Sequence, residues 1–141
     1  MCLLKKIYDV IKRDEGRIVF KRIHKLGYLD KDAIKKLYSI YESRFLQALK
    51  IITEDKVKKY IFVPSGLEIW IVVGKTRDYL ILDNYYCSCV DYMMNVALRK
   101  NRSFCYHLLA KMLAESLNQY ELFKLPDSYY KKFISEWRKF E

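Results

Sequence analysis

The most informative part of the sequence runs from residue 87 to residue 107 and reads CSCVDYMMNVALRKNRSFCYH. Cys87 and Cys89 stand one residue apart, and fifteen residues later Cys105 and His107 stand one residue apart. Three of the chain's four cysteines and one of its two histidines therefore lie within 21 residues. Zinc prefers four sulfur or nitrogen ligands at the corners of a tetrahedron. The spacing predicts one zinc ion bound by these four side chains.

The spacing within each pair indicates how the backbone delivers the ligands. Cys-x-Cys at the end of a strand directs both thiols to one face, because the side chains of a strand alternate. Cys-x-His at the start of a helix supplies the other pair, where the helix dipole favours a thiolate. Four ligands leave no open position for water, which is typical of structural rather than catalytic zinc. The alternative is a metal-free core of small buried cysteines and a hydrogen-bonded histidine.

Before residue 87 the apolar residues follow strand periodicity from residue 57 onward. Turn residues Pro64-Ser65-Gly66 and 74–78 separate the apolar runs. The pattern predicts a three-stranded antiparallel meander that leads directly into the first cysteine pair. Its expected strands are 57–63, 67–73 and 79–82.

Apolar residues at helical spacing predict helices on both sides of the meander. Asp30 is a suitable N-cap for the longest of them, and Pro126 precedes the last. The expected helices are 2–13, 17–26, 31–52, 103–119 and 128–140. This order indicates one α+β domain with a helical N-terminal region (1–52), a zinc finger (57–119) and a C-terminal helix (128–140).

Composition favours a protein that stays inside the cell and contacts polyanions. Hydrophobic residues make up 52% of the 141 residues, yet no apolar run approaches the roughly 18 residues that a membrane helix needs. The net charge is +10, which attracts nucleic acid. Arg99, Lys100 and Arg102 lie between the two ligand pairs and are candidate contacts to DNA phosphates. A merely solvated loop is the alternative.

Two further features bear on function. Ala110 follows His107 on the same helix, and its small side chain lets that helix approach the metal site closely. The last helix carries a broad aromatic band, which is either core or a protein interface. Its candidate partner contacts are Tyr130, Phe133 and Trp137. No catalytic arrangement is visible, since His24 is the only other histidine, and we expect no enzymatic activity.

Cys87-x-Cys89 and Cys105-x-His107 together resemble the SWIM zinc-finger pattern. The extension Cys105-Tyr106-His107-Leu108-Leu109-Ala110 is similar to the Cys-x-His-x-x-Ala form of the Shu-complex SWIM proteins. The Pro64-Ser65-Gly66 turn and the strand end at residues 71–74 also resemble that family's meander. The resemblance covers residues 57–119, and residues 1–52 show none.

This resemblance implies an accessory factor in homologous recombination and DNA repair. Shu-type SWIM proteins act beside RecA-family recombinases or their paralogues and promote their assembly on DNA. The expected partners are therefore such a recombinase or paralogue and single-stranded DNA, bound weakly and without sequence preference. The short chain indicates a prokaryotic source, with an archaeal member as the candidate, and a cytoplasmic or nucleoid-associated location. A generic nucleic-acid-binding zinc module and a pure protein-interaction adaptor are the alternatives.

Overall fold

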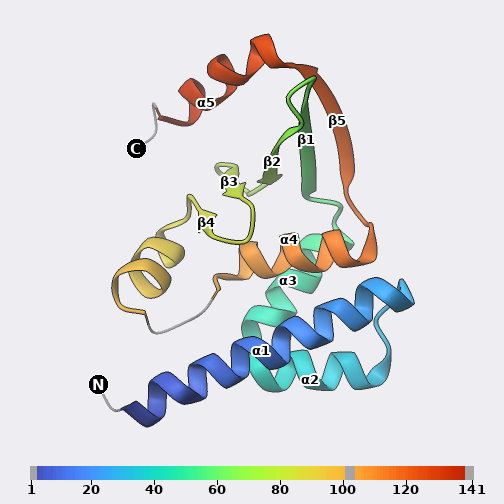
Figure 1. The fold of residues 1–141 in the computed structure, drawn as a ribbon, viewed down its shortest axis with the longest axis vertical. Helices are drawn as coiled ribbons and strands as arrows, with labels where there is room; N and C mark the ends of the chain where they lie inside the picture. The colour runs from blue at the N-terminus through green and yellow to red at the C-terminus, as the bar shows by residue number, and fades with distance from the viewer. Residues whose placement is uncertain (1–2, 101–103, 139–141) are drawn as a thin grey trace.

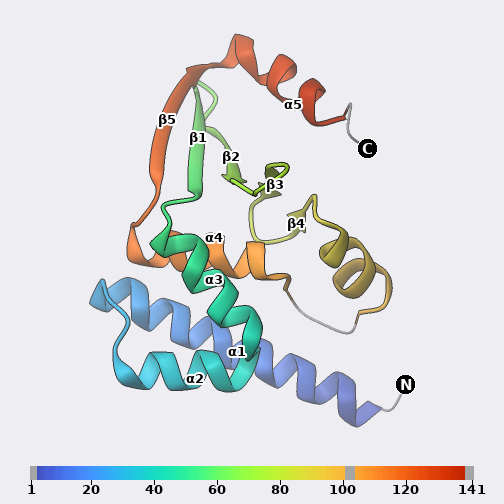
Figure 2. The same ribbon diagram turned by 180° about the vertical axis from the view of Figure 1, so that it is seen from behind.

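A five-stranded mixed sheet forms the middle of the molecule, in the order β4-β3-β2-β1-β5. The structure, a computed structural model, describes residues 3–100 and 104–138, with the side chains of residues 4–14, 137 and 138 left out. One group of helices lies on one side of the sheet, and one short helix lies on the opposite side (Figures 1 and 2). The predicted α+β class is confirmed.

The predicted meander is present as the centre of the sheet. Its strands are antiparallel neighbours, with Val57 opposite Val72 and Trp70 opposite Ile81. The three strands are β1 (Val57–Val63), β2 (Leu67–Val72) and β3 (Tyr79–Leu82).

Two strands extend the meander into a mixed sheet. The two-residue strand β4 (Tyr86–Cys87) pairs antiparallel with β3. At the other edge β5 (Glu121–Pro126) pairs parallel with β1, with Lys58 opposite Glu121. The prediction of a meander alone missed β5, because its partner β1 lies more than fifty residues earlier and its own residues include two charges and a proline.

The first helix is continuous, so the predicted break near Gly16 is wrong. Helix α1 (Leu3–Leu26) runs through Gly16 without interruption. A Cβ atom at Gly16 would lie only 2.3 Å from the hydroxyl oxygen of Tyr41. Glycine is therefore explained by the close approach of Tyr41 rather than by a helix end.

The predicted helix 31–52 is two helices, α2 (Lys31–Tyr41) and α3 (Ser43–Thr53). Asp30 caps α2 as predicted, since its Oδ1 accepts the Ala33 N–H at 2.8 Å. Glu42 ends α2 with φ 56° and ψ −128°, values that no helix continues through. The break lets α2 pack on α1 while α3 packs on α4. Ile34, although apolar, is 41% exposed on α2.

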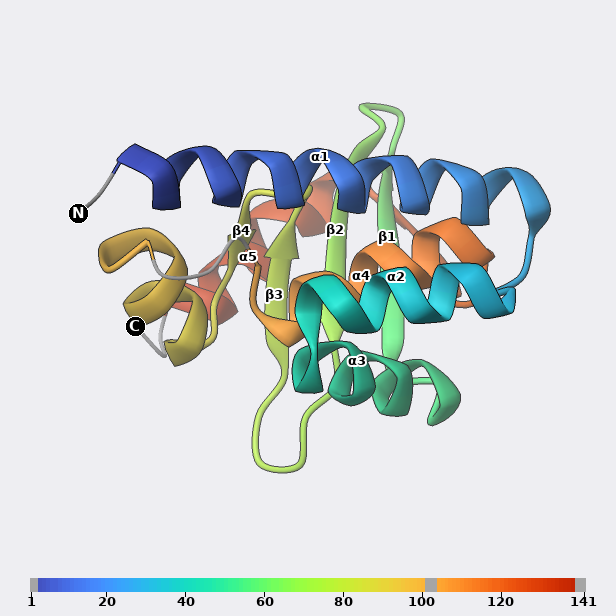
Figure 3. The same cartoon turned by 90° about the horizontal axis from the view of Figure 1, so that it is seen from below.

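Helix α4 (Tyr106–Leu117) is the central helix of the domain. It packs on α3 and α1 on one side and contacts four strands of the sheet on the other. Seen from the helical end in Figure 3, α1, α2 and α3 lie in front of α4 and the sheet. Both Ala110 and Ala114 are fully buried, in keeping with close packing around α4. The helix is shorter than the predicted 103–119, because it begins after Cys105 and ends at the left-handed C-cap Asn118, while residue 103 lies outside the described residues.

The far face of the sheet carries a second, smaller core. Phe62, Ile69, Ile71 and Leu80 are buried there, beneath side chains of α5 (Tyr130–Arg138). A 3₁₀ turn (Asp127–Tyr129) replaces the predicted first turn of that helix. The predicted end at residue 140 lies outside the described residues.

Candidate metal centre

Two hydrogen bonds hold the first cysteine pair against strand β3. The Leu80 N–H donates to the Ser88 hydroxyl oxygen at 2.9 Å, and the Ser88 N–H donates to the Leu80 carbonyl at 3.0 Å. Cys87 is the last residue of β4, and Cys89 follows two residues later. The sequence predicts that the pair follows β3 directly, whereas a turn at residues 83–85 intervenes and Cys87 itself belongs to the short strand β4.

The second pair sits at the start of α4, as predicted. Cys105 is the N-cap residue and His107 lies in the first turn. The ligand atoms of all four residues lie within 4.8 Å of one another. Tetrahedral zinc with sulfur at about 2.3 Å places its ligands roughly 3.8 Å apart, so the four atoms need only a small inward shift. The fold therefore brings together the four residues that the sequence predicts as zinc ligands.

Burial and bonding state agree with a structural metal. The four residues are between 0% and 4% exposed, and the three cysteines are free thiols rather than disulfides. Nδ1 of His107 is buried and has no hydrogen-bond partner among the described residues. An unpartnered buried nitrogen beside three sulfurs is costly unless it binds something. The Cys₃His set fits one structural zinc ion, and zinc would bind to the three thiolate sulfurs and a neutral imidazole nitrogen.

Backbone donors and neighbouring thiols prepare two of the sulfurs for a metal. The Tyr92 N–H points at Cys89 Sγ at 3.2 Å, and the Leu108 N–H points at Cys105 Sγ at 3.5 Å. The pKa of Cys89 is lowered, chiefly by its hydrogen bond with Cys105 and secondly by its hydrogen bond with Cys87. The pKa of Cys87 is raised, chiefly by its hydrogen bond with Cys105, secondly by its hydrogen bond with Cys89, and also by burial.

Two tyrosines position the imidazole of His107. The ring of Tyr79 lies 4.1 Å from it, centroid to centroid, and the ring of Tyr106 lies 4.0 Å away. Neither tyrosine is expected at the site from the sequence, although each has a signal. Tyr106 is the middle residue of the Cys105-x-His107 motif, and Tyr79 begins the strand that precedes the cysteines.

The segment between the pairs is not a plain loop. A π-helix occupies Tyr92–Leu98, and Arg99 and Lys100 follow it as exposed side chains. These two predicted DNA contacts are therefore accessible. The third, Arg102, lies outside the described residues.

The aromatic band of α5 packs largely within the chain. Tyr130 meets the ring of Phe62 edge-on at 5.1 Å, and Phe133 lies 5.0 Å from the ring of Tyr60. Both are half-buried, so part of each ring serves as core. The side chain of Trp137 is not among the described residues, and a partner contact by these three residues stays a prediction.

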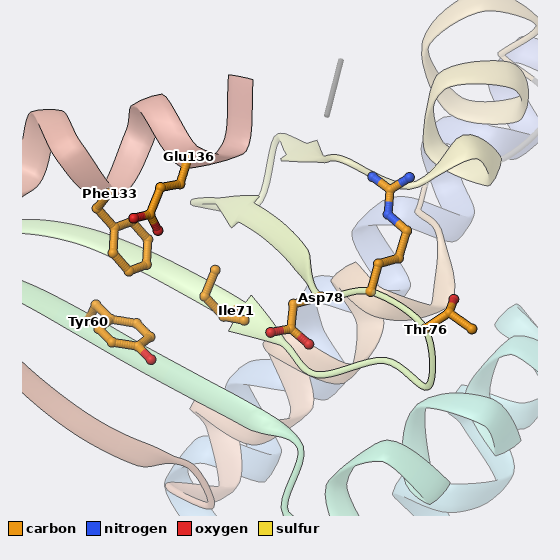
Figure 4. A pocket seen from close by; sticks show the side chains of 7 residues that line it. Tyr60, Ile71, Thr76, Asp78, Phe133 and Glu136 are labelled. Atoms are coloured by element: carbon orange, nitrogen blue, oxygen red, sulfur yellow. The ribbon is translucent and has the colours of Figure 1, made fainter. Parts of the chain in front are cut away.

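A cavity of about 580 Å³ lies between α5 and the sheet, away from the cysteines. Tyr60, Ile71 and Phe133 form its apolar side. The carboxylates that reach toward it are Asp78, from the loop before β3, and Glu136, from α5 (Figure 4). Its lining residues include no histidine or cysteine, so this cavity is separate from the metal centre.

A curated protein of Dictyostelium discoideum, "Zinc finger SWIM domain-containing protein 7 homolog", is similar to this chain. The two are 27% identical over 131 residues, which covers 92% of this chain and 80% of the relative. The match therefore includes most of residues 1–52, and it confirms the resemblance to SWIM zinc-finger proteins. No protein-family model matches the chain, and no solved structure matches it. No described helix is long and apolar enough to cross a membrane.

Proposed function

We propose that this SWIM-type zinc protein is a non-enzymatic accessory factor in homologous recombination that binds a RecA-family recombinase or paralogue. The observation that supports this role is the closed Cys₃His cluster followed by the buried Ala110. That combination is the motif by which the chain resembles the Shu-complex SWIM proteins.

Zinc acts indirectly in this proposal. It ties the β3–β4 hairpin to the first turn of α4, and α4 in turn contacts α1, α3 and the sheet. Metal loss would therefore loosen the arrangement of the surfaces around α4 without removing any partner contact directly. We expect partner binding to depend on zinc through this scaffold.

A binding experiment with the zinc-loaded chain tests the proposal. We expect a direct complex with a recombinase or paralogue of the same cell. Ala110→Thr should weaken the complex and need not release zinc, because a branched side chain has no room at a fully buried position and pushes the helix away from the sheet. Ala97→Thr is the matched control, since Ala97 is exposed on the π-helix.

Trp137→Ala addresses the aromatic band of α5. A folded variant that loses more than about 1–2 kcal/mol of binding marks an interface anchor. A variant that loses folding stability instead marks a core residue. The recombination role is refuted if the folded, zinc-loaded chain binds no recombinase or paralogue of its cell, with or without single-stranded DNA.

Weak binding to single-stranded DNA is the second function that we propose. Arg99 and Lys100 are exposed directly after the π-helix, in a chain of net charge +10. Affinity should fall steeply with salt, because bound cations displace condensed counterions. Arg99→Ala with Lys100→Ala should reduce the slope of log K against log salt by up to about 1.4, at roughly 0.7 for each phosphate contact.

The matched control removes two exposed lysines from α2, Lys31 and Lys35. It lowers the net charge equally but leaves the segment between the ligand pairs intact. Equal slopes for the two double variants would mean that only net charge matters. Absence of DNA binding beside a firm protein complex would favour the pure adaptor.

A further inference from the structure

The side chain of Lys111 is almost entirely buried, which is unusual for lysine. Lys111 lies on α4, one turn after His107, and is 1% exposed. Its Nζ donates to Asn84 Oδ1 at 2.8 Å, pairs with Glu115 Oε2 at 3.0 Å and lies 4.9 Å from the centre of the Trp70 ring. A buried ammonium group persists only where such partners replace water.

The contact with Asn84 joins the two halves of the metal centre. Asn84 belongs to the turn between β3 and β4, three residues before Cys87. Lys111 lies four residues after His107, on the helix that carries the second ligand pair. The hydrogen bond therefore spans from the hairpin that delivers two cysteines to the helix that delivers Cys105 and His107.

The other two partners have different roles. Glu115 lies on α4 itself and is 46% exposed, so its ion pair with Lys111 cannot hold the hairpin. Trp70 lies in β2 and is 1% exposed, and its ring provides an attractive surface for the ammonium group. Among the described contacts of Lys111, the bond to Asn84 is the one that links the ligand pairs.

We propose that Lys111 is a positioning residue for zinc, which holds the β3–β4 turn on α4 so that the ligand pairs are already arranged before the metal binds. A prearranged site loses less conformational freedom on binding and so binds more tightly. Residues that orient metal ligands from outside the coordination shell typically change metal affinity ten- to a hundredfold. The inference rests on the Cys₃His site and is independent of the recombinase partner.

The test compares zinc affinity with folding stability in the same variants. Lys111→Met keeps the length and apolar stem but removes the ammonium group, and Asn84→Ala removes its acceptor. We expect each to weaken zinc binding about ten- to a hundredfold in a competition titration with a chromophoric chelator. The double variant should be little weaker than either single variant, because both remove one contact.

Two controls separate this role from a general effect on stability. Asn84→Asp keeps an acceptor oxygen and should retain zinc affinity, while Glu115→Gln should change it less than threefold. Thermal unfolding is measured with zinc and with excess chelator. A purely structural lysine would lower stability equally in both conditions and leave the zinc affinity unchanged. That result overturns the proposal, as does unchanged zinc affinity in Asn84→Ala if Lys111→Met fails to fold.

Discussion

Gly16 in the middle of α1 offers a substitution for which helix propensity and packing give opposite expectations. Alanine is about 1 kcal/mol more favourable than glycine inside a helix, so propensity alone predicts that Gly16→Ala stabilises the protein. The structure places the added Cβ atom 2.3 Å from Tyr41 Oη, far inside van der Waals contact. One of the two residues must therefore move.

Tyr41 has little freedom to move away. It is 4% exposed, and its ring lies 6.4 Å from that of Phe20 and 6.3 Å from that of Phe104. Overpacking a well-filled core costs about 1–3 kcal/mol. After the gain in helix propensity, we expect Gly16→Ala to lower the free energy of unfolding by roughly 1 kcal/mol.

A double-mutant cycle with Tyr41→Phe isolates the clash. The Tyr41 hydroxyl is buried with no hydrogen-bond partner among the described residues, so its removal should cost little. The nearest atom to the new Cβ then becomes ring carbon Cζ at 3.3 Å, a tight but tolerable contact. In the phenylalanine background Gly16→Ala should be neutral or stabilising, which gives a coupling energy of about 1–2 kcal/mol.

Urea unfolding of the four zinc-loaded proteins measures this cycle. Arg17→Ala, at the exposed neighbouring position, serves as the control and should change stability by less than about 0.5 kcal/mol. If Gly16→Ala stabilises the protein equally with tyrosine and with phenylalanine at position 41, the close approach does not explain the glycine.

Four further outcomes are expected. Cys87→Ser should reduce zinc below one ion per chain by metal analysis and lower the melting temperature. Burial raises the pKa of Tyr41 to about 12, so between pH 10 and 12 the unfolded chain has lost a proton that the folded chain retains. Stability should therefore fall by roughly 2–3 kcal/mol over that window, and less in Tyr41→Phe, by urea unfolding at each pH. Asp127→Ala should cost about 1–2 kcal/mol in thermal unfolding, because its carboxylate accepts the Ser65 hydroxyl at 2.7 Å and the Ser65 N–H at 3.1 Å. Phe133→Ala should cost about 1–3 kcal/mol by urea unfolding, because half of its ring packs on the second core.

Features that depend on neighbouring residues could be predicted from the sequence. The four zinc ligands follow from two short spacings, the meander follows from alternation and turn residues, and the Asp30 cap follows from its place before an apolar stripe. In each case the residues that determine the structure lie close together along the chain, so the local pattern contains the necessary information.

Features that depend on distant partners were decided by tertiary structure. The sequence predicts a helix end near Gly16, because the reason for this glycine, the hydroxyl of Tyr41, lies on another helix. Strand β5 forms because β1 offers a free edge, and the break at Glu42 serves the separate packing of α2 on α1 and α3 on α4. In the sequence Lys111 resembles an ordinary surface lysine. Only the folded structure shows that Asn84, Glu115 and Trp70 surround it. Burial and close approach depend on pairs of segments that are distant in the sequence. The local pattern of residues does not specify which segments come into contact.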